Sequence, residues 1–385
     1  MENKIIAKSK YRYGDVFHAL CPYFAMFPPE FAREAIKKYS KENDLVIDPF
    51  SGRGTTLFEA RLLNRKAIAN DINPVAVTIS RAKTQPLDLE LCINNIKKLE
   101  HRYNKTDKSS LKTEAKKLPV FFKYAYHKET LLQILWLRKK LKNTKTKEGV
   151  FIKTLCISYL HGEFQKTKQS YFSNNLPHTY CPKPDYSVRF WKERNMVAPK
   201  IDVFASLVDR ATFRITTSNQ HTLKRPGHVI LGDVRKLDEN VKKITKEKAQ
   251  LVVTSPPYLK ITSYEEDQWL RLWFLGGNPY PSQGKITKDD RISSQDKYID
   301  FLGETWKATA KIMKVGGFIV CRIGQSAKDS YPLKYIIEES IKRSGANLKM
   351  IKQSYSPFKA VRQAKMFGKQ YGNSGEYDFV IKVLG

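Results

Sequence analysis

The apolar positions of the first 85 residues follow two patterns, short continuous runs and helical spacing. Residues 45–48 form an apolar run that ends in an acid, and residues 66–71 form a second run that ends in another acid. Residues 55–64, between these runs, carry apolar side chains at helical spacing. A further helix is expected after Pro28, because proline is tolerated in a first helical turn. This succession predicts a helix followed by a strand, loop, helix and strand of a parallel α/β sheet.

Strand signals stop after residue 71 and return only at residue 229. Short apolar runs at residues 229–233, 251–254 and 318–321 predict three more strands. Residues 348–357 and 376–385 predict two C-terminal strands that pair as an antiparallel edge. The sheet is therefore expected to be one domain that a long insert divides in sequence.

The insert is expected to be largely helical. Helical spacing recurs at residues 130–141 and 150–160, and a stretch rich in Tyr, Pro and Asn follows at 170–195. The insert has 28 Lys and Arg residues against 12 Asp and Glu residues, so it is more basic per residue than the whole chain. We expect three blocks, namely the first part of the sheet domain (1–85), the insert (86–225) and the second part of the sheet domain (226–385).

The whole chain is strongly basic. It carries 69 Lys and Arg residues against 38 Asp and Glu residues, a formal net charge of +31 over 385 residues. Hydrophobic residues make up 41% of the chain and are spread along it, which excludes a disordered protein. Positive charge in this excess repels itself unless a polyanion is the usual partner, and nucleic acid is the commonest one. An acidic membrane surface or a merely lysine-rich soluble surface is the alternative.

Export, a membrane span and a metal site are not indicated. The chain has no run of about 18 apolar residues, and its N-terminus lacks an apolar segment followed by a small-residue cleavage site. Its five cysteines never form Cys-x-x-Cys, which argues against a disulfide framework and a cysteine-rich zinc site. His178 and Cys181 are one ligand pair without a second, so no metal is expected. A reducing cytoplasm fits these features.

A glycine-rich loop, Asp-Pro-Phe-Ser-Gly-Arg-Gly-Thr-Thr (48–56), follows the first predicted strand and opens a helix. Its glycines allow a sharp turn and close approach to a ligand, and the helix start offers free N–H donors. Acids end three successive strands, at Asp48, Asp71 and Asp233, where carboxylates can accept from ribose hydroxyls or an adenine amine. These features predict a nucleoside site at the carboxyl edge of the sheet. Ordinary turns are the alternative, and a dinucleotide is disfavoured because G-x-G-x-x-G spacing is missing.

A second motif follows the strand at 251–254, which runs directly into Ser255, Pro256, Pro257 and Tyr258. Prolines cannot continue a sheet ladder and have a fixed φ, so the chain leaves the strand in a rigid shape. Such rigidity suits a site that holds a reacting group, and a simple strand-ending turn is the alternative.

Four segments in this order resemble the motifs of the DNA amino-methyltransferases: DPFSGRGTT (48–56), NDINP (70–74), LGDV (231–234) and TSPPY (254–258). That family uses S-adenosylmethionine to methylate exocyclic amines of DNA bases. The Ser-Pro-Pro-Tyr form is similar to the N4-cytosine group, whereas N6-adenine enzymes more often carry Asp-Pro-Pro-Tyr. The resemblance implies an α/β class I methyltransferase fold, with a mostly parallel seven-stranded sheet, an antiparallel last strand and, here, a helical insert.

The resemblance also implies roles for the matched residues. Ser255 Oγ and the Pro256 carbonyl would accept hydrogen bonds from the target amine, which favours its pyramidal, reactive form. Tyr258 would stack on the target base, flipped out of the duplex. A cytosine-C5 enzyme is disfavoured, since it would need a Pro-Cys nucleophile and no cysteine follows a proline. The catalytic residues would be Ser255, Pro256, Pro257 and Tyr258, and the cofactor would be held by Asp48, Phe50, Gly52, Gly54, Asp71, Ile72, Asp233 and Val234.

Two features near the loop qualify this match. Arg53 departs from the small residue that the family often has between the two glycines. Residues 21–31 look like the segment that flanks the cofactor and precedes the loop in such chains, although prolines before a helix are common.

The insert would read the target. Its cations and aromatic side chains suit contact with phosphates and stacking on bases or sugars, and a basic loop at 359–373 could also touch DNA. The alternative is that the aromatic residues form the core of the insert and the cations are a solvated face. The candidate DNA contacts are Lys183, Arg189, Lys192 and Arg194 of the insert and Arg362 of the C-terminal loop.

The function expected from these motifs is methylation of the N4 amine of cytosine in double-stranded DNA, with S-adenosyl-L-methionine as cofactor. N6-adenine methylation, RNA guanine-N2 methylation and an inactive DNA-binding protein are the alternatives. A separately acting restriction endonuclease is a conceivable partner, the oligomeric state is left open, and a nucleoid-associated role in a prokaryotic cytoplasm is expected.

Overall fold

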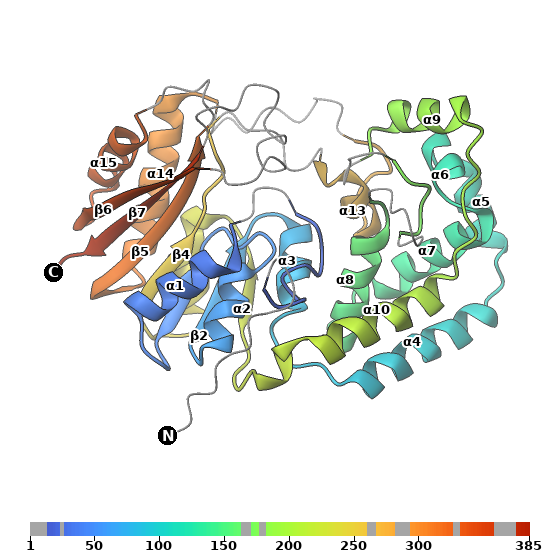
Figure 1. The fold of residues 1–385 in the computed structure, drawn as a ribbon, viewed down its shortest axis with the longest axis horizontal. Coiled ribbons are helices and arrows are strands. Elements are labelled where there is room, and N and C mark those ends of the chain that lie inside the picture. Colours follow the sequence, from blue (N-terminus) through green and yellow to red (C-terminus); the bar gives the residue numbers. More distant parts are fainter. Residues whose placement is uncertain are drawn as a thin grey trace. The chain divides into compact units, whose positions relative to one another are not determined.

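The chain of the computed structural model divides into two units (Figure 1). One, the sheet unit, comprises residues 25–80, 223–263 and 287–385. The other, the helical unit, comprises residues 1–24, 81–222 and 264–286, and so takes up two further segments besides the predicted insert. The structure describes residues 14–23, 27–162, 171–176, 182–259, 267–281, 293–325, 332–357 and 375–385.

The sheet unit contains a seven-stranded sheet in the order β3-β2-β1-β4-β5-β7-β6. All neighbours from β3 to β5 pair in parallel, and β7 is antiparallel to both β5 and β6. The predicted α/β class, with a mostly parallel sheet and an antiparallel last strand, is confirmed. The strands are β1 (Leu45–Asp48), β2 (Lys66–Asp71), β3 (His228–Leu231), β4 (Ala249–Thr254), β5 (Met313–Gln325), β6 (Leu348–Pro357) and β7 (Gly375–Val383).

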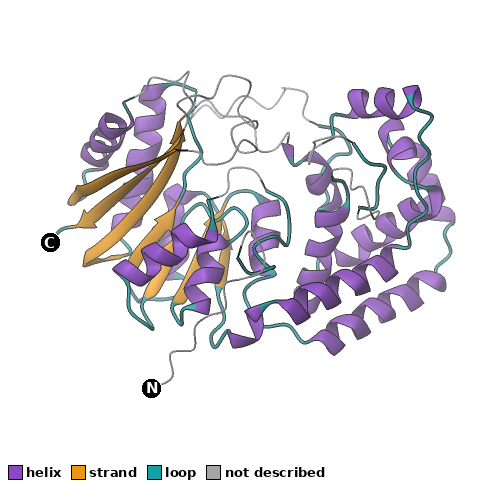
Figure 2. Cartoon of the chain, viewed as in Figure 1, coloured by secondary structure: helices purple, strands orange, loops and turns teal. Residues whose placement is uncertain are grey.

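The central strands are buried on both faces, which explains why they appear in the sequence as continuous apolar runs. Leu45 and Ile47 of β1 belong to one hydrophobic core, and Val46 between them belongs to the core on the opposite face. Helices cover both faces (Figure 2). The helices of this unit are α1 (Pro29–Tyr39), α2 (Thr55–Leu62), α3 (Pro74–Arg81), α11 (Leu237–Lys242), α14 (Gln295–Ala310) and α15 (Leu333–Ser344), with a 3₁₀ turn η2 (Val234–Lys236).

The helical unit packs around buried aromatic side chains. Phe122 lies 4.5 Å from Trp273 and Phe121 lies 5.6 Å from Trp191, measured between ring centroids. Asp202 is the N-cap of helix α10, and its side chain accepts a hydrogen bond from the backbone N–H of Phe204. The helices are α4 (Leu89–Asn104), α5 (Ser109–Lys117), α6 (Val120–Ala125), α7 (Lys128–Leu141), α8 (Lys147–Tyr159), α9 (Pro184–Glu193), α10 (Val203–Thr217), the 3₁₀ turn η1 (Asn219–Thr222) and α13 (Trp269–Phe274).

Among the described residues, no helix is both long enough and apolar enough to cross a membrane.

Candidate active site

Four parallel strands bring the acids and the proline motif to one edge of the sheet (Figure 1). β1 ends at Asp48 and β2 ends at Asp71, while Asp233 follows β3 and Ser255 follows β4. Because β1 lies between β2 and β4, the glycine-rich loop that follows β1 lies between the other strand ends. Ligands of open α/β sheets bind at this edge, outside the carboxyl ends of the strands.

The glycine-rich loop is a tight turn that packs on α3. Gly52 has a φ of +49° and Gly54, at the start of α2, has a φ of +74°, both in the left-handed region that favours glycine. A Cβ on Gly54 would lie 2.8 Å from Ser80 Oγ and 3.2 Å from Ser80 Cα. Conformation and space therefore both require glycine at position 54.

Asp71 holds this loop against β2. Its Oδ2 accepts from the Gly52 N–H at 2.8 Å, and its Oδ1 accepts from the Asn73 N–H at 2.9 Å. Burial raises the pKa of Asp71 to about 6. Each carboxylate oxygen has a second lone pair, so these bonds leave acceptor capacity for a nucleoside hydroxyl. Asp71 thus orders the loop, which the sequence pattern had not indicated.

Asn70 ties three strand ends together and was missed in the sequence. It is 1% exposed, and its Nδ2 donates to the Pro49 carbonyl at 3.0 Å and to the Gly232 carbonyl at 3.1 Å. These bonds join the segments that follow β1 and β3 to the end of β2. The signal that could have revealed it is a polar amide in a strand that is otherwise apolar and buried.

Asp48 links β1 to the strand that carries the proline motif. It is 1% exposed, and its Oδ1 accepts from Thr254 Oγ1 at 2.7 Å and from the Phe50 N–H at 3.1 Å. Its Oδ2 is buried without a hydrogen-bond partner, and burial raises the pKa of Asp48 to about 7. A buried carboxylate oxygen beside a glycine-rich loop is suited to a ligand that brings a donor or a positive charge.

Asp233 and Val234, the residues expected at the adenine, have different surroundings. Both carboxylate oxygens of Asp233 contact Arg235, with Nη2 2.6 Å from Oδ2 and Nε 3.1 Å from Oδ1. The Val234 side chain is in the hydrophobic core, so only its backbone can meet a ligand. Ile72, by contrast, is 56% exposed and offers an apolar surface directly after Asp71.

Two side chains of the glycine-rich loop, Phe50 and Arg53, lie at least partly inside the protein. Phe50 is half-buried, with its ring centroid 5.8 Å from that of Phe301. Arg53 is buried, and its Nε donates to Thr55 Oγ1 at 3.3 Å. The departure from a small residue is therefore accommodated inside the protein rather than in solvent.

The proline motif leaves β4 at the same edge. Ser255 is half-buried, and its Oγ lies 3.5 Å from the hydroxyl of Tyr258, the limit of a hydrogen bond. The Tyr258 ring is 5% exposed and packs over Gly324 of β5, where an added Cβ would lie 2.5 Å from the ring. In this arrangement the ring of Tyr258 is covered, so stacking on a base requires part of that cover to move.

A buried ion cluster, also missed in the sequence, lies on β5 and β7 two residues from Gly324. Arg322 is 7% exposed, and its guanidinium donates to Asp378 at 2.7 and 2.8 Å and to Glu376 at 2.9 Å. Its guanidinium carbon also lies 3.9 Å from the ring centroid of Phe31, in the segment at 21–31. The cluster fixes the strand against which Tyr258 packs.

The four candidate DNA contacts of the insert are exposed, and all lie in or beside α9. Tyr186 is 45% exposed and lies 6.0 Å from Phe190 between ring centroids, and the Arg194 guanidinium lies 4.0 Å from the Phe190 ring. Trp191 and Phe172, two aromatic residues of the insert, are core residues at 1% exposed, so they do not offer a stacking surface. The exposed residues are Lys183, Arg189, Lys192 and Arg194, and Arg362 lies outside the described residues.

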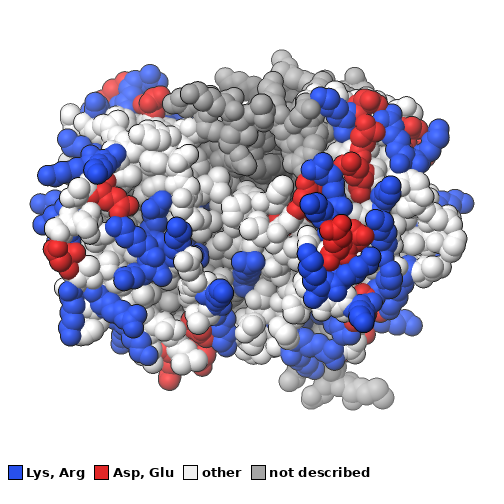
Figure 3. All heavy atoms as spheres, turned by 180° about the vertical axis from the view of Figure 1, so that it is seen from behind, with Lys and Arg blue, Asp and Glu red and all other residues white. Residues whose placement is uncertain are grey.

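The surface of the described residues carries more Lys and Arg than Asp and Glu on the face in Figure 3. No group of three or more His, Cys, Asp or Glu side chains suited to a metal ion occurs in the described part of the chain. His178 and Cys181 are outside that part.

Comparisons with known proteins point to DNA methylases. A family model of the N6/N4 type, described as DNA methylase, matches residues 3–82. The type II methyltransferase M.MjaII of Methanocaldococcus jannaschii is 26% identical over 163 residues, which are 41% of this chain and 29% of that protein. The orphan methyltransferase M.BamHII of Bacillus amyloliquefaciens is 47% identical over 49 residues, 13% of this chain and 18% of that protein. The matched part thus spans less than a third of either relative.

Similarity to solved structures is weak. TrmN from Thermus thermophilus has a TM-score of 0.36 and 8% identity, and the match covers 96% of this chain and 52% of that chain. A score at this level supports no conclusion about function.

Proposed function

We propose that this chain is an S-adenosylmethionine-dependent DNA methyltransferase that methylates the exocyclic N4 amine of cytosine in double-stranded DNA. The observation that carries the proposal is the hydrogen bond from Thr254 Oγ1 to Asp48 Oδ1, at 2.7 Å. It joins the strand of the TSPPY motif to the strand of the glycine-rich loop, so a cofactor site and an amine-binding site share one sheet edge. The DNA methylase model and the methyltransferase relatives support the coarser part of the proposal, methylation of DNA.

The residues around the loop fit S-adenosylmethionine. When bound, this cofactor supplies an electrophilic methyl group. The positive φ of Gly52 and Gly54 lets the backbone approach the amino-acid part closely, and the unpartnered Asp48 Oδ2 suits its ammonium group. Asp71 would accept from the ribose hydroxyls, and the exposed Ile72 would contact the base. The carboxylate of Asp233 would accept a hydrogen bond from the adenine amine while it also contacts Arg235.

The proline motif suits an amine that is a poor nucleophile. The lone pair of an exocyclic amine is conjugated into its ring, and hydrogen bonds accepted from the N–H groups favour the pyramidal form. Ser255 Oγ and the Pro256 carbonyl would be those acceptors, held in position because two prolines fix the backbone. The amine nitrogen would itself be the nucleophile for the methyl group and would release one of its protons to solvent, so no covalent intermediate with the protein is needed.

The α9 face of the helical unit would contact DNA outside the catalytic site. We define this face as Tyr186, Arg189, Phe190, Lys192 and Arg194, all in or next to one helix. Cations of this face suit phosphates, and the exposed Tyr186 with the half-buried Phe190 suits a base or sugar. A restriction endonuclease that acts separately on the same DNA is part of this proposal.

The proposal is tested by methyl transfer from labelled S-adenosylmethionine to duplex DNA and, in parallel, to tRNA. Wild-type protein should label DNA, and Ser255→Ala should lose transfer while S-adenosylmethionine binding measured by calorimetry is kept. Transfer to tRNA alone would replace the proposal with the RNA guanine-N2 activity. Full activity of Ser255→Ala would show that the amine acceptor has been assigned to the wrong residue, and no transfer to any nucleic acid would favour an inactive DNA-binding protein.

A further inference from the structure

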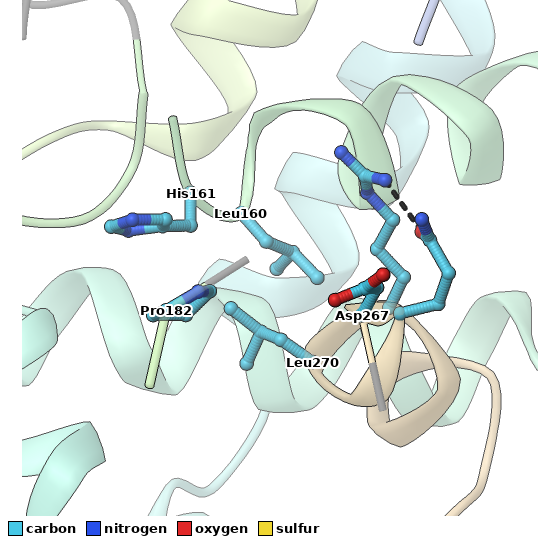
Figure 4. Close-up of a pocket in the computed structure, with 7 residues that line it drawn as sticks. Leu160, His161, Pro182, Asp267 and Leu270 are labelled. Carbon is cyan, nitrogen blue, oxygen red and sulfur yellow. Dashed lines mark hydrogen bonds between the residues drawn. The ribbon is translucent and has the colours of Figure 1, made fainter. Parts of the chain in front are cut away.

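A cavity in the helical unit, drawn in Figure 4, is too small to hold a base of DNA. Its volume is about 10 Å³, which is room for about one water molecule, and Leu160, Pro182 and Leu270 are among the residues that line it. A base finds no room there, whereas an exposed aromatic ring can stack on a base at the surface of a protein. One such ring lies in the sheet unit, at the edge that carries the proposed active site.

Tyr355 is the outermost of three aromatic side chains that lie in a row across β6 and β7 (Figure 1). It is 46% exposed and pairs in register with Tyr377, with the two ring centroids 4.9 Å apart. Tyr377 is half-buried, and its ring is stacked on that of Phe379 at 6.5 Å between centroids. Phe379 is fully buried in the hydrophobic core. The row therefore runs from the core to the solvent, and its buried end anchors the exposed ring.

Gly375 leaves the space in which the Tyr355 ring lies. A Cβ on this glycine would lie 2.6 Å from Cζ of that ring and 2.7 Å from its hydroxyl oxygen. The ring thus rests directly on the backbone of β7, and the Tyr377 ring flanks it. A ring held in this way has few positions to lose when a ligand packs on it, which lowers the entropic cost of binding.

The register of the strands places Tyr355 at the level of the proline motif. Thr254 of the motif pairs with Cys321 of β5. Two positions further along β5, Ile323 pairs with Tyr377, the partner of Tyr355. β6 runs parallel to β4, because β7 is antiparallel to both β5 and β6, so the C-terminal ends of β4 and β6 share one edge. Neighbouring strands lie about 4.8 Å apart, which places β6 about 10 Å from β5 and about 14 Å from β4.

The sequence between β6 and β7 indicates the charge of the partner. Residues 358–374 contain four Lys and Arg residues and no Asp or Glu. The residues before and after this segment, Pro357 and Gly375, pair with each other at the edge that carries the proposed active site. Cations without acids suit a polyanion. An aromatic ring beside them therefore suits a nucleotide better than an apolar peptide.

We propose that Tyr355, supported by Tyr377, packs on the deoxyribose or an unstacked base of a nucleotide beside the methylated one. This inference rests on the proposed function, since it takes DNA as the substrate. Nucleotides follow one another at about 3.4 Å along a strand of the duplex, so a distance of about 10–14 Å corresponds to roughly three or four positions from the target base. Every base and every sugar has an apolar face, so this contact adds affinity without selecting a sequence.

The test measures the Kd of a fluorescein-labelled duplex of mixed sequence by anisotropy at several salt concentrations. Tyr355→Ala should weaken binding at least fivefold and leave the slope of log Kd against log salt unchanged, because no cation is removed. Tyr355→Phe keeps the ring and should stay within twofold of wild type. Gly375→Ala keeps the tyrosine but displaces its ring, and should weaken binding at least threefold. Ile351→Ala, which removes a 47% exposed apolar side chain from the same strand, is the matched control and should bind as wild type does.

Wild-type affinity of Tyr355→Ala, an equal loss in Tyr355→Phe, or a changed salt slope would overturn the inference. A duplex that carries 5-iododeoxyuridine, irradiated in complex with the wild-type protein, gives a second readout that does not depend on methylation. It should cross-link to Tyr355, and cross-links confined to other residues would count against the contact. Cross-linking at Tyr355 in a protein that methylates nothing would overturn only the proposed function. Methylation of DNA that Tyr355→Ala leaves unchanged in affinity would overturn only this inference, and absence of any binding to the duplex would overturn both.

Discussion

The substitution Gly54→Ala tests whether the glycine-rich loop must pack as tightly as the structure indicates. Two costs are expected. A non-glycine residue at φ +74° is strained by about 1–2 kcal/mol. The new Cβ would also lie 2.8 Å from Ser80 Oγ and 3.2 Å from Ser80 Cα. The hydroxyl can rotate away but the Cα cannot, so overpacking adds about 1–3 kcal/mol.

Gly316→Ala separates the two costs. Gly316 has a φ of +80°, and a Cβ there would meet nothing within 4 Å, so only the strain remains. Urea unfolding should show a loss of about 1–2 kcal/mol for Gly316→Ala and about 2–5 kcal/mol for Gly54→Ala. Calorimetry should show S-adenosylmethionine binding at least tenfold weaker in Gly54→Ala and unchanged in Gly316→Ala. Equal stability of the two variants, or unchanged cofactor affinity in Gly54→Ala, would refute the reasoning.

Three further predictions concern the acids and the cations. Because the pKa of Asp48 is raised by burial to about 7, the folded state favours its protonated form, and its contribution to stability is present at low pH and is lost as the pH rises through 7. Between pH 6 and pH 8 the titration of Asp48 should therefore cost the cofactor-free protein about 1.4 kcal/mol of unfolding free energy, and that of Asp71, with a pKa of about 6, should add about 0.4 kcal/mol. Asp48→Asn should remove the larger part of this loss; a flat wild-type profile over this range would contradict the raised pKa of Asp48. Asp71→Ala should weaken S-adenosylmethionine binding at least tenfold in calorimetry, because it frees the Gly52 N–H as well as removing the ribose acceptor; an unchanged Kd would mean that neither role holds. Replacing both Arg189 and Lys192 by Gln should lower the slope of log Kd for duplex DNA against log salt by about 1.8, with Lys334→Gln as control; an unchanged slope would place the phosphates elsewhere.

The positions of the central strands along the chain were within reach of the sequence because each of them is a short apolar run closed by a distinctive residue. Burial on both faces makes such runs continuous, and the acids and prolines at their ends mark where the chain turns. The two C-terminal strands were predicted as an antiparallel pair at an edge of the sheet, and they do pair with each other. The sequence also predicts the edge of the sheet at which the site lies, since the carboxyl ends of parallel strands share one edge.

The contacts that build the site depend on residues far apart in the chain and could not be predicted in the same way. Asp48 was expected at the cofactor loop, but nothing in the sequence indicated that its carboxylate also accepts from Thr254, 206 positions later. Tyr258 was expected to be a stacking surface, yet its ring packs on Gly324, which belongs to a strand more than 60 positions away. The local sequence identifies a candidate residue, whereas tertiary packing determines which other residues contact its side chain.

Two helices of the helical unit, α9 and α13, also could not be predicted from local pattern. α9 lies in the stretch rich in Tyr, Pro and Asn, where no individual helix was predicted, and Pro184 begins it as a first-turn proline. Its apolar face is short because only Ser187, Val188 and Trp191 are buried. α13 likewise consists of six residues whose stability comes from Phe121 and Phe122, which lie about 150 positions earlier.

The measurement that tests the central claim most directly is the identity of the methylated nucleoside. Duplex DNA of mixed sequence is incubated with the wild-type protein and labelled S-adenosylmethionine, digested to nucleosides and analysed by mass spectrometry, with Ser255→Ala as the blank. The proposal predicts N4-methyldeoxycytidine in the wild-type digest and none in the blank. N6-methyldeoxyadenosine as the labelled product would contradict the assignment of cytosine, and absence of any methylated deoxynucleoside would contradict the assignment of DNA methylation.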